Sequence, residues 1–128
     1  MATRQRAELR MLASSDAPAH ARRWVRETLD GSALSDQAVN DAVLMIDELV
    51  TNAVVHAGTP VVVVLEPTPS GYRCEVVDQG VDGPLPRLVD VTAGAGRGLR
   101  FVEFMATAWG VDRSERDTTV WVDVTVTE

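Results

Sequence analysis

Hydrophobic residues recur along the chain with two different periods. In residues 35–57 they return every three or four positions, which predicts a helix with one apolar stripe. The stripe consists of Val39, Ala42, Val43, Ile46, Leu49, Val50, Ala53 and Ala57. Ser35 can cap this helix at its start, and Gly58 with Pro60 can end it.

An earlier segment shows the same helical spacing. Pro18 lies in the first turn, Gly31 lies beyond the end, and the residues that recur at helical spacing are Ala17, Ala21, Trp24, Val25, Thr28 and Leu29. Residues 14–16 supply side chains that can cap this helix. A third helix is predicted where the spacing returns near the end of the chain, on Leu99, Val102, Met105, Ala106 and Trp109.

The remaining regular segments follow the two-residue period of strands or are continuously apolar. Residues 61–66 and 72–78 are separated by turn residues 67–71, which predicts a hairpin. Residues 118–127 alternate valine with polar positions, and a turn over 113–117 joins them to a shorter strand around Gly110 and Val111. Residues 8–13 read as a further short strand.

These elements predict one α+β domain spanning residues 1–128. Its architecture is a two-layer sandwich, in which helices cover one face of a mixed, mostly antiparallel sheet. Residues 79–96 are rich in glycine and proline and predict a long loop, which in a compact domain usually serves function.

Composition narrows the class of protein. The formal net charge of −7 argues against a direct nucleic-acid binder, which usually presents a basic face. Arg22, Arg23 and Arg26 form a local cluster, either a solvated helix face or a contact for an acidic partner.

One cysteine, Cys74, cannot form an internal disulfide, and it is expected to be buried. No segment resembles a membrane span or signal peptide, so we expect a cytoplasmic protein without a membrane partner.

Three polar motifs remain once the apolar stripes are subtracted. Glu48, Asn52 and His56 stand four residues apart and so rise along one side of the predicted helix. Such a row is commonly a solvated face, but a carboxylate, an amide and an imidazole also make a polar wall.

The second motif, Asp78-Gln79-Gly80, ends an apolar strand. A carboxylate there can accept a hydrogen bond from an amine, and a glycine permits close approach of a flat ring. The third, residues 94–99, leads into the predicted third helix with the glycines Gly94, Gly96 and Gly98. Glycine-rich turns before helices can bind phosphate through backbone N–H groups, although a plain flexible loop has the same composition.

The three motifs together resemble those of the Bergerat-fold ATPases, the histidine-kinase-like ATPase superfamily. The segment ELVTNAVVHA is similar to their N box, Asp78-Gln79-Gly80 to their G1 box, and residues 94–99 to their G2 box and lid. The resemblance spans residues 35–126 and keeps the family order. The short chain and the segment GRGLRFV resemble, more narrowly, the anti-sigma-factor serine/threonine kinases.

This resemblance implies a role for each matching residue. Glu48 would activate the acceptor hydroxyl, Asn52 would hold Mg²⁺, and Asp78 would bind the adenine amine. The remaining nucleotide-binding residues would be His56, Gly80, Gly94, Gly96, Arg97, Gly98, Leu99 and Thr119. Many relatives carry Gly-Lys ahead of that threonine, whereas this chain has Asp117-Thr118.

The implied function is a Mg-ATP-dependent protein kinase that phosphorylates a serine or threonine of an anti-anti-sigma partner with a STAS domain. A sigma factor would be the second partner, and a homodimer is an open alternative to a monomer. The rival hypothesis is a module that binds ATP and a protein without phosphoryl transfer. Glu48 favours the kinase, and the missing Gly-Lys favours the binding module.

Overall fold

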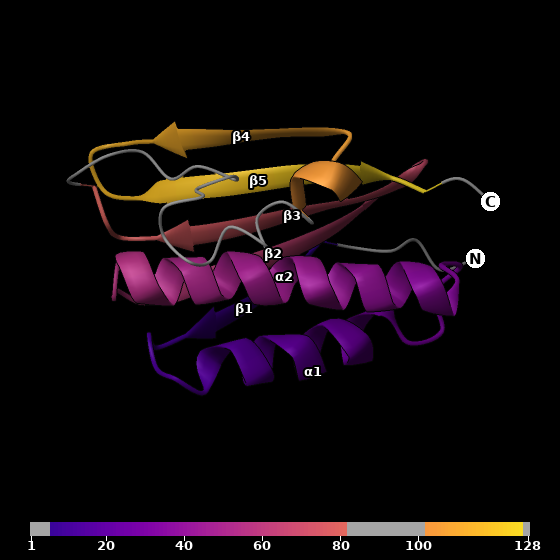
Figure 1. Ribbon diagram of the computed structural model, residues 1–128, viewed down its shortest axis with the longest axis horizontal. Helices are drawn as coiled ribbons and strands as arrows, with labels where there is room; N and C mark the ends of the chain where they lie inside the picture. Colours follow the sequence, from indigo (N-terminus) through magenta and orange to yellow (C-terminus); the bar gives the residue numbers. More distant parts are fainter. Residues whose placement is uncertain (1–5, 82–101, 127–128) are drawn as a thin grey trace.

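The computed structural model describes residues 6–81 and 102–126 of the chain. Within them, two long helices and five strands follow one another as shown in Figure 1. Their bounds, in chain order, are β1 Ala7–Met11, α1 Ala17–Leu29, α2 Asp36–His56, β2 Val61–Thr68, β3 Gly71–Asp78, β4 Ala108–Arg113 and β5 Thr118–Thr125.

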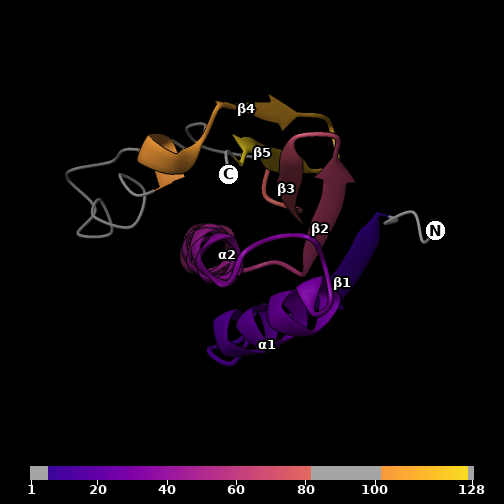
Figure 2. The same cartoon turned by 90° about the vertical axis from the view of Figure 1, so that its right-hand side faces the viewer.

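The strands form one open sheet in the order β1-β2-β3-β5-β4. Helices α1 and α2 lie together on one face of it (Figure 2). The two-layer α+β class predicted from the sequence is therefore confirmed. The prediction allowed for a mixed sheet, but each of the four pairings among the described strands is antiparallel.

Helix α2 begins and ends where its sequence predicts. The Oγ of Ser35 accepts a hydrogen bond from the backbone N–H of Ala38 at 3.1 Å, which satisfies one of the free N–H groups of the first turn. Gly58 follows the helix with a φ of 65°, a conformation that glycine adopts without strain. Helix α1 differs at its start, because its N-cap residue Asp16 makes no side-chain capping bond.

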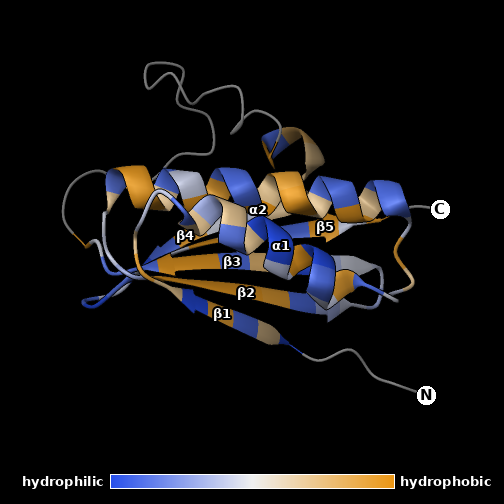
Figure 3. Cartoon of the chain, turned by 90° about the horizontal axis from the view of Figure 1, so that it is seen from below, coloured by the Kyte–Doolittle hydropathy of each residue, from blue (hydrophilic) through white to orange (hydrophobic). Residues whose placement is uncertain are grey.

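The core fills the space between the helices and the sheet. Val25 of α1, Ile46 of α2 and Val63 of β2 are fully buried there. Cys74 is buried among them as a free thiol, as predicted. Viewed from below, the strands β2 and β3 show long hydrophobic stretches where they lie against the helices (Figure 3).

Polar contacts also join the two helices. Arg22 of α1 forms an ion pair with Asp47 of α2 at 2.6 Å, and Arg26 donates to Asn40 at 3.0 Å. Two arginines of the basic cluster thus face the neighbouring helix, which neither hypothesis for the cluster anticipated.

The predicted third helix is wrong at its C-terminal end. Residues 102–105 are helical, but Trp109 belongs to strand β4 and pairs with Val122 of β5. The backbone N–H of Thr107 already donates to the carbonyl of Asp123 at 2.7 Å. Pairing with β5 therefore overrides the helical spacing that continues through Ala106 and Trp109.

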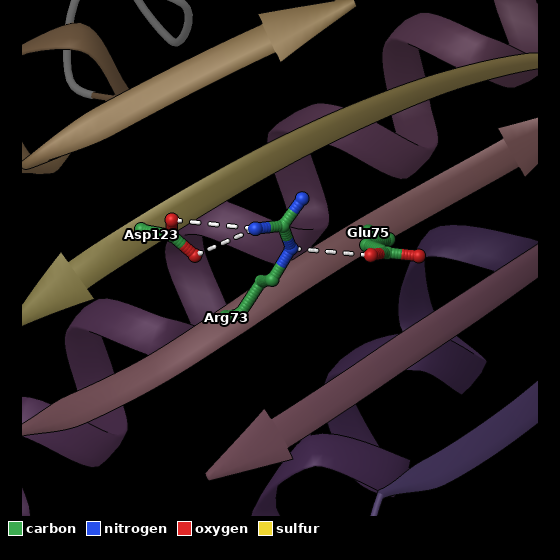
Figure 4. Close-up of polar contacts among 3 residues, drawn as sticks. All are labelled: Arg73, Glu75 and Asp123. Carbon is green, nitrogen blue, oxygen red and sulfur yellow. Dashed lines mark hydrogen bonds and ion pairs between the residues drawn. The ribbon is translucent and has the colours of Figure 1, made fainter. Parts of the chain in front are cut away.

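The face of the sheet away from the helices carries a charged cluster. The Arg73 guanidinium lies 4.4 Å from the centroid of the Trp121 ring, so the cation stacks on the aromatic face. The same guanidinium donates to Glu75 at 3.1 Å and to Asp123 at 3.4 Å (Figure 4). Two carboxylates and one ring thus fix a single arginine across β3 and β5.

Gly110 of β4 lies under the Trp121 ring. A Cβ added at Gly110 would come within 2.5 Å of the ring atom Cζ2, so the ring would have to move. We expect Gly110→Ala to lower the free energy of unfolding by about 1–3 kcal/mol, the usual cost of overpacking. Denaturant unfolding of the purified chain measures it. In a Trp121→Leu background the same alanine should cost much less, and an equal cost there would show that the ring is not responsible.

Candidate functional site

Asp78 stands at the C-terminal end of β3, on the face that the helices cover. Its residue is only 7% exposed, although it is an acid at the end of a strand. Its Oδ1 accepts a hydrogen bond from the backbone N–H of Gly80 at 2.8 Å. This bond closes a tight turn over residues 78–80 and fixes the direction of the carboxylate.

The turn is held against the C-terminal end of α2. A Cβ on Gly80 would lie 3.1 Å from Cβ of Ala57 and 3.1 Å from Oδ1 of Asp78, so a side chain at this position would crowd both the end of the helix and the carboxylate. Beside it, the backbone N–H of Gln79 donates to Oγ1 of Thr59 at 2.8 Å. The end of the motif on β3 and the end of the motif on α2 are therefore joined.

Thr118, rather than Thr119, lies next to the Asp78–Gly80 turn. Thr118 pairs with Asp78 across β3 and β5, is 1% exposed, and donates from Oγ1 to the carbonyl of Gly80 at 2.5 Å. Thr119 pairs with Val77, and its side chain lies on the opposite face of the sheet because successive residues of a strand alternate. The structure thus brings Thr118 next to Asp78 and places the predicted site residue Thr119 on the other face of the sheet.

Glu48, Asn52 and His56 all lie on α2, as predicted. Glu48 and Asn52 are half-buried, whereas His56, the last residue of the helix, is exposed. With a rise of about 1.5 Å per residue, Asn52 stands about 7.5 Å along the helix axis from Ala57, and Glu48 about 13.5 Å. Along α2, from its C-terminal end toward its start, the Asp78–Gly80 turn therefore comes first, then the Asn52 amide, then the Glu48 carboxylate.

Burial acts on both carboxyl groups. It raises the pKa of Glu48 above its usual 4.5, and the charge of neighbouring Asp47 raises it further. Burial also raises the pKa of Asp78, while the Gly80 N–H and the charge of Arg113 oppose that rise. Raised pKa values of partly buried acids occur often in functional sites.

Comparison with known proteins identifies the family. Residues 12–124 match the histidine kinase-like ATPase domain. The chain belongs to this family. No curated protein matches its sequence significantly.

Two solved structures share the fold of this ATPase domain. One contains the RsbU and RsbW domains of Rv1364c from Mycobacterium tuberculosis, with a TM-score of 0.65 and 22% identity. The match covers 91% of this chain but only 31% of the mycobacterial one. The other is the SiaB-SiaC complex from Pseudomonas aeruginosa, with a TM-score of 0.69, 14% identity and coverage of 91% of this chain and 87% of that one.

The glycine-rich motif of the ATPase domain falls outside the described residues. This applies to the predicted site residues Gly94, Gly96, Arg97, Gly98 and Leu99. In the parts of the chain that the structure does describe, no group of three or more His, Cys, Asp or Glu residues is placed to hold a metal ion. No helix in those same parts is long and apolar enough to cross a membrane.

The pKa of Asp78 gives the ATPase domain a pH-dependent stability. Because the folded-state pKa is raised, the contribution of Asp78 is fully present below the unfolded pKa and is lost as pH rises through the folded pKa. We expect Asp78→Asn, which has no charge to bury, to gain stability relative to the parent between pH 3 and pH 7. Thermal unfolding across that range tests this. A constant difference between the two proteins would contradict it.

Proposed function

We propose that this chain is a Mg-ATP-binding regulatory kinase of the anti-sigma-factor type, which phosphorylates a serine or threonine of an anti-anti-sigma partner. One observation carries the proposal. The Asp78–Gly80 turn is held against the end of the same helix that carries Asn52 and Glu48. The turn, Asn52 and Glu48 follow one another along α2 in the same order as the base, the phosphate chain and the terminal phosphate follow one another in ATP.

The base would bind at the turn. The Asp78 carboxylate is an acceptor, its Oδ1 is fixed by Gly80, and an acceptor suits the exocyclic amine of adenine. Gly80 has no side chain to keep a flat ring away from the backbone. The threonine proposed for this subsite is Thr118 in place of Thr119, because Thr118 pairs with Asp78 whereas Thr119 pairs with Val77.

The phosphates would lie further along α2, with Asn52 as a protein ligand of Mg²⁺. A hard oxygen donor such as the Asn52 amide fits Mg²⁺, which usually takes one or two protein ligands together with substrate phosphates. When bound, Mg²⁺ neutralises charge on the phosphates. His56, Gly94, Gly96, Arg97, Gly98 and Leu99 remain proposed contacts of the nucleotide.

Glu48 would accept the proton of the incoming hydroxyl. It lies one helical turn before Asn52, on the side toward the terminal phosphate in this arrangement. Its half-burial and the raised pKa make it a stronger proton acceptor than an exposed glutamate. These properties favour the kinase over a module that only binds ATP.

The partners are proposed from the family resemblance and from the solved relatives. RsbW occurs in one chain with RsbU in the mycobacterial structure, and SiaB occurs in a complex with SiaC. In both structures a second domain or protein accompanies this fold, which supports a role together with a protein partner. We propose that this protein is a STAS-domain anti-anti-sigma factor, that a sigma factor is the second partner, and that the cycle runs in the cytoplasm.

Transfer of label from γ-labelled ATP to a candidate STAS protein tests the proposal directly. The kinase should label a serine or threonine of the partner in the presence of Mg²⁺. ATP binding by calorimetry without any transfer would favour the binding module. Absence of ATP binding would contradict both functions.

A further inference from the structure

Arg113, the last residue of β4, is tied to the candidate site through two hydrogen bonds. Its Nε donates to Oγ1 of Thr118 at 2.9 Å, and that hydroxyl donates to the carbonyl of Gly80 at 2.5 Å. Gly80 in turn donates from its N–H to Oδ1 of Asp78 at 2.8 Å. Three hydrogen bonds, joined through the backbone of Gly80, therefore link the edge strand β4 to the carboxylate of Asp78.

The direction of this chain is fixed by the chemistry of its members. An arginine side chain can only donate, so Thr118 must accept from it. A hydroxyl has a single proton, and the Gly80 carbonyl has none. The Thr118 proton is therefore committed to Gly80, and the hydroxyl cannot rotate to release it without losing a partner.

The strand order brings the three residues of this hydrogen-bonded link side by side. Arg113 and Asp78 both pair with Thr118, one from each side, since β5 lies between β4 and β3. Thr118 is 1% exposed, so water does not compete for its hydroxyl. A hydrogen bond to a charged donor in such surroundings is stronger than a neutral one.

We propose that Arg113 is a positioning residue, which acts through Thr118 to fix the Asp78–Gly80 turn in the orientation that reads the base. This inference rests on the proposed binding of ATP at that turn. It adds a residue from the edge strand β4 to the determinants of base specificity. The Asp78 carboxylate would accept a hydrogen bond from the adenine amine, and the Arg113–Thr118 pair would hold the turn that carries Asp78.

The experiment compares ATP with inosine triphosphate, which carries a carbonyl in place of the adenine amine. Affinities are measured by calorimetry for the parent, Arg113→Met, Thr118→Val and the double variant. We expect each single variant to bind ATP about 3- to 10-fold more weakly, the range for loss of one hydrogen bond. Binding of inosine triphosphate should change little, because it offers Asp78 no amine.

Two further comparisons separate positioning from a general loss of structure. The double variant should bind ATP no more weakly than the weaker single variant, because both changes break the same chain. Thr118→Ser keeps the hydroxyl and should restore most of the affinity. Arg116→Met is the matched control, since Arg116 is an exposed arginine in the neighbouring turn.

Each contrary outcome has a distinct meaning. Equal weakening of both nucleotides, or losses that multiply in the double variant, would overturn the positioning role while ATP binding stands. Parent-like binding by Arg113→Met would overturn it as well. If the parent itself does not bind ATP, the proposed function fails first, and this inference falls with it.

Discussion

Glu48→Gln is expected to reduce phosphoryl transfer by roughly 10²–10⁴-fold, the usual contribution of a positioned general base. The glutamine keeps the size of the side chain and its place on α2, but it cannot accept a proton. ATP binding should therefore remain close to that of the parent. Single-turnover transfer to the partner measures the rate, and calorimetry measures the binding.

A second variant and a control make this result interpretable. Asn52→Ala should weaken Mg-dependent binding of ATP, so the two residues of α2 separate into a binding role and a catalytic role. Glu27→Gln alters an exposed glutamate of α1 and should leave both quantities unchanged. Transfer by Glu48→Gln at the parent rate would remove Glu48 from the mechanism.

Asp78→Asn is expected to weaken ATP binding by about 1.5–3 kcal/mol, because it replaces a charged acceptor with a neutral amide. The parent should prefer ATP to GTP, since guanine presents a carbonyl where adenine presents its amine. The variant should lose this preference, because an asparagine amide can also donate to a carbonyl. Competition between the two nucleotides checks it.

The same substitution, Asp78→Asn, should change stability and ATP affinity in opposite directions. Asp78→Asn is expected to stabilise the free protein near pH 7 and to weaken ATP binding at the same pH. Asp112→Asn is the matched control, since Asp112 is an exposed acid on β4 whose side chain lies on the other face of the sheet. Equal affinity of the parent for ATP and GTP would contradict the assignment of Asp78 to the base.

Periodicity and turn chemistry were enough to predict the fold class. The stripe on α2 has one clear period, and Ser35 and Gly58 mark its ends, so α2 could be placed almost to the residue. The alternation in β5 likewise predicted a strand buried on one face. These signals are local, and tertiary packing agrees with them.

The structure differs from the sequence predictions at residues whose position depends on pairing between neighbouring strands. Trp109 fits a helical pattern with Ala106, but pairing with Val122 draws it into β4. The sequence analysis named Thr119 and not its neighbour Thr118, and a shift of one residue reverses the face of a strand. Only the register with Asp78 distinguishes them. Arg113 carried no sequence signal, because its link to the site runs through hydrogen bonds across two strands.

The strand order also sets how the sequence of this domain can vary. β3 and β4 each run antiparallel to β5 and both end beside Thr118, so the chain between Asp78 and Ala108 has to return along the whole sheet. None of the four pairings among the described strands depends on the length of that connection. The entropy of closing a connection grows slowly, by about 0.6 kcal/mol for each doubling of its length. A change in the length of the connection between Gly80 and the buried Val102 should therefore cost the sheet little free energy, so selection on that length would come from the proposed nucleotide contacts rather than from folding.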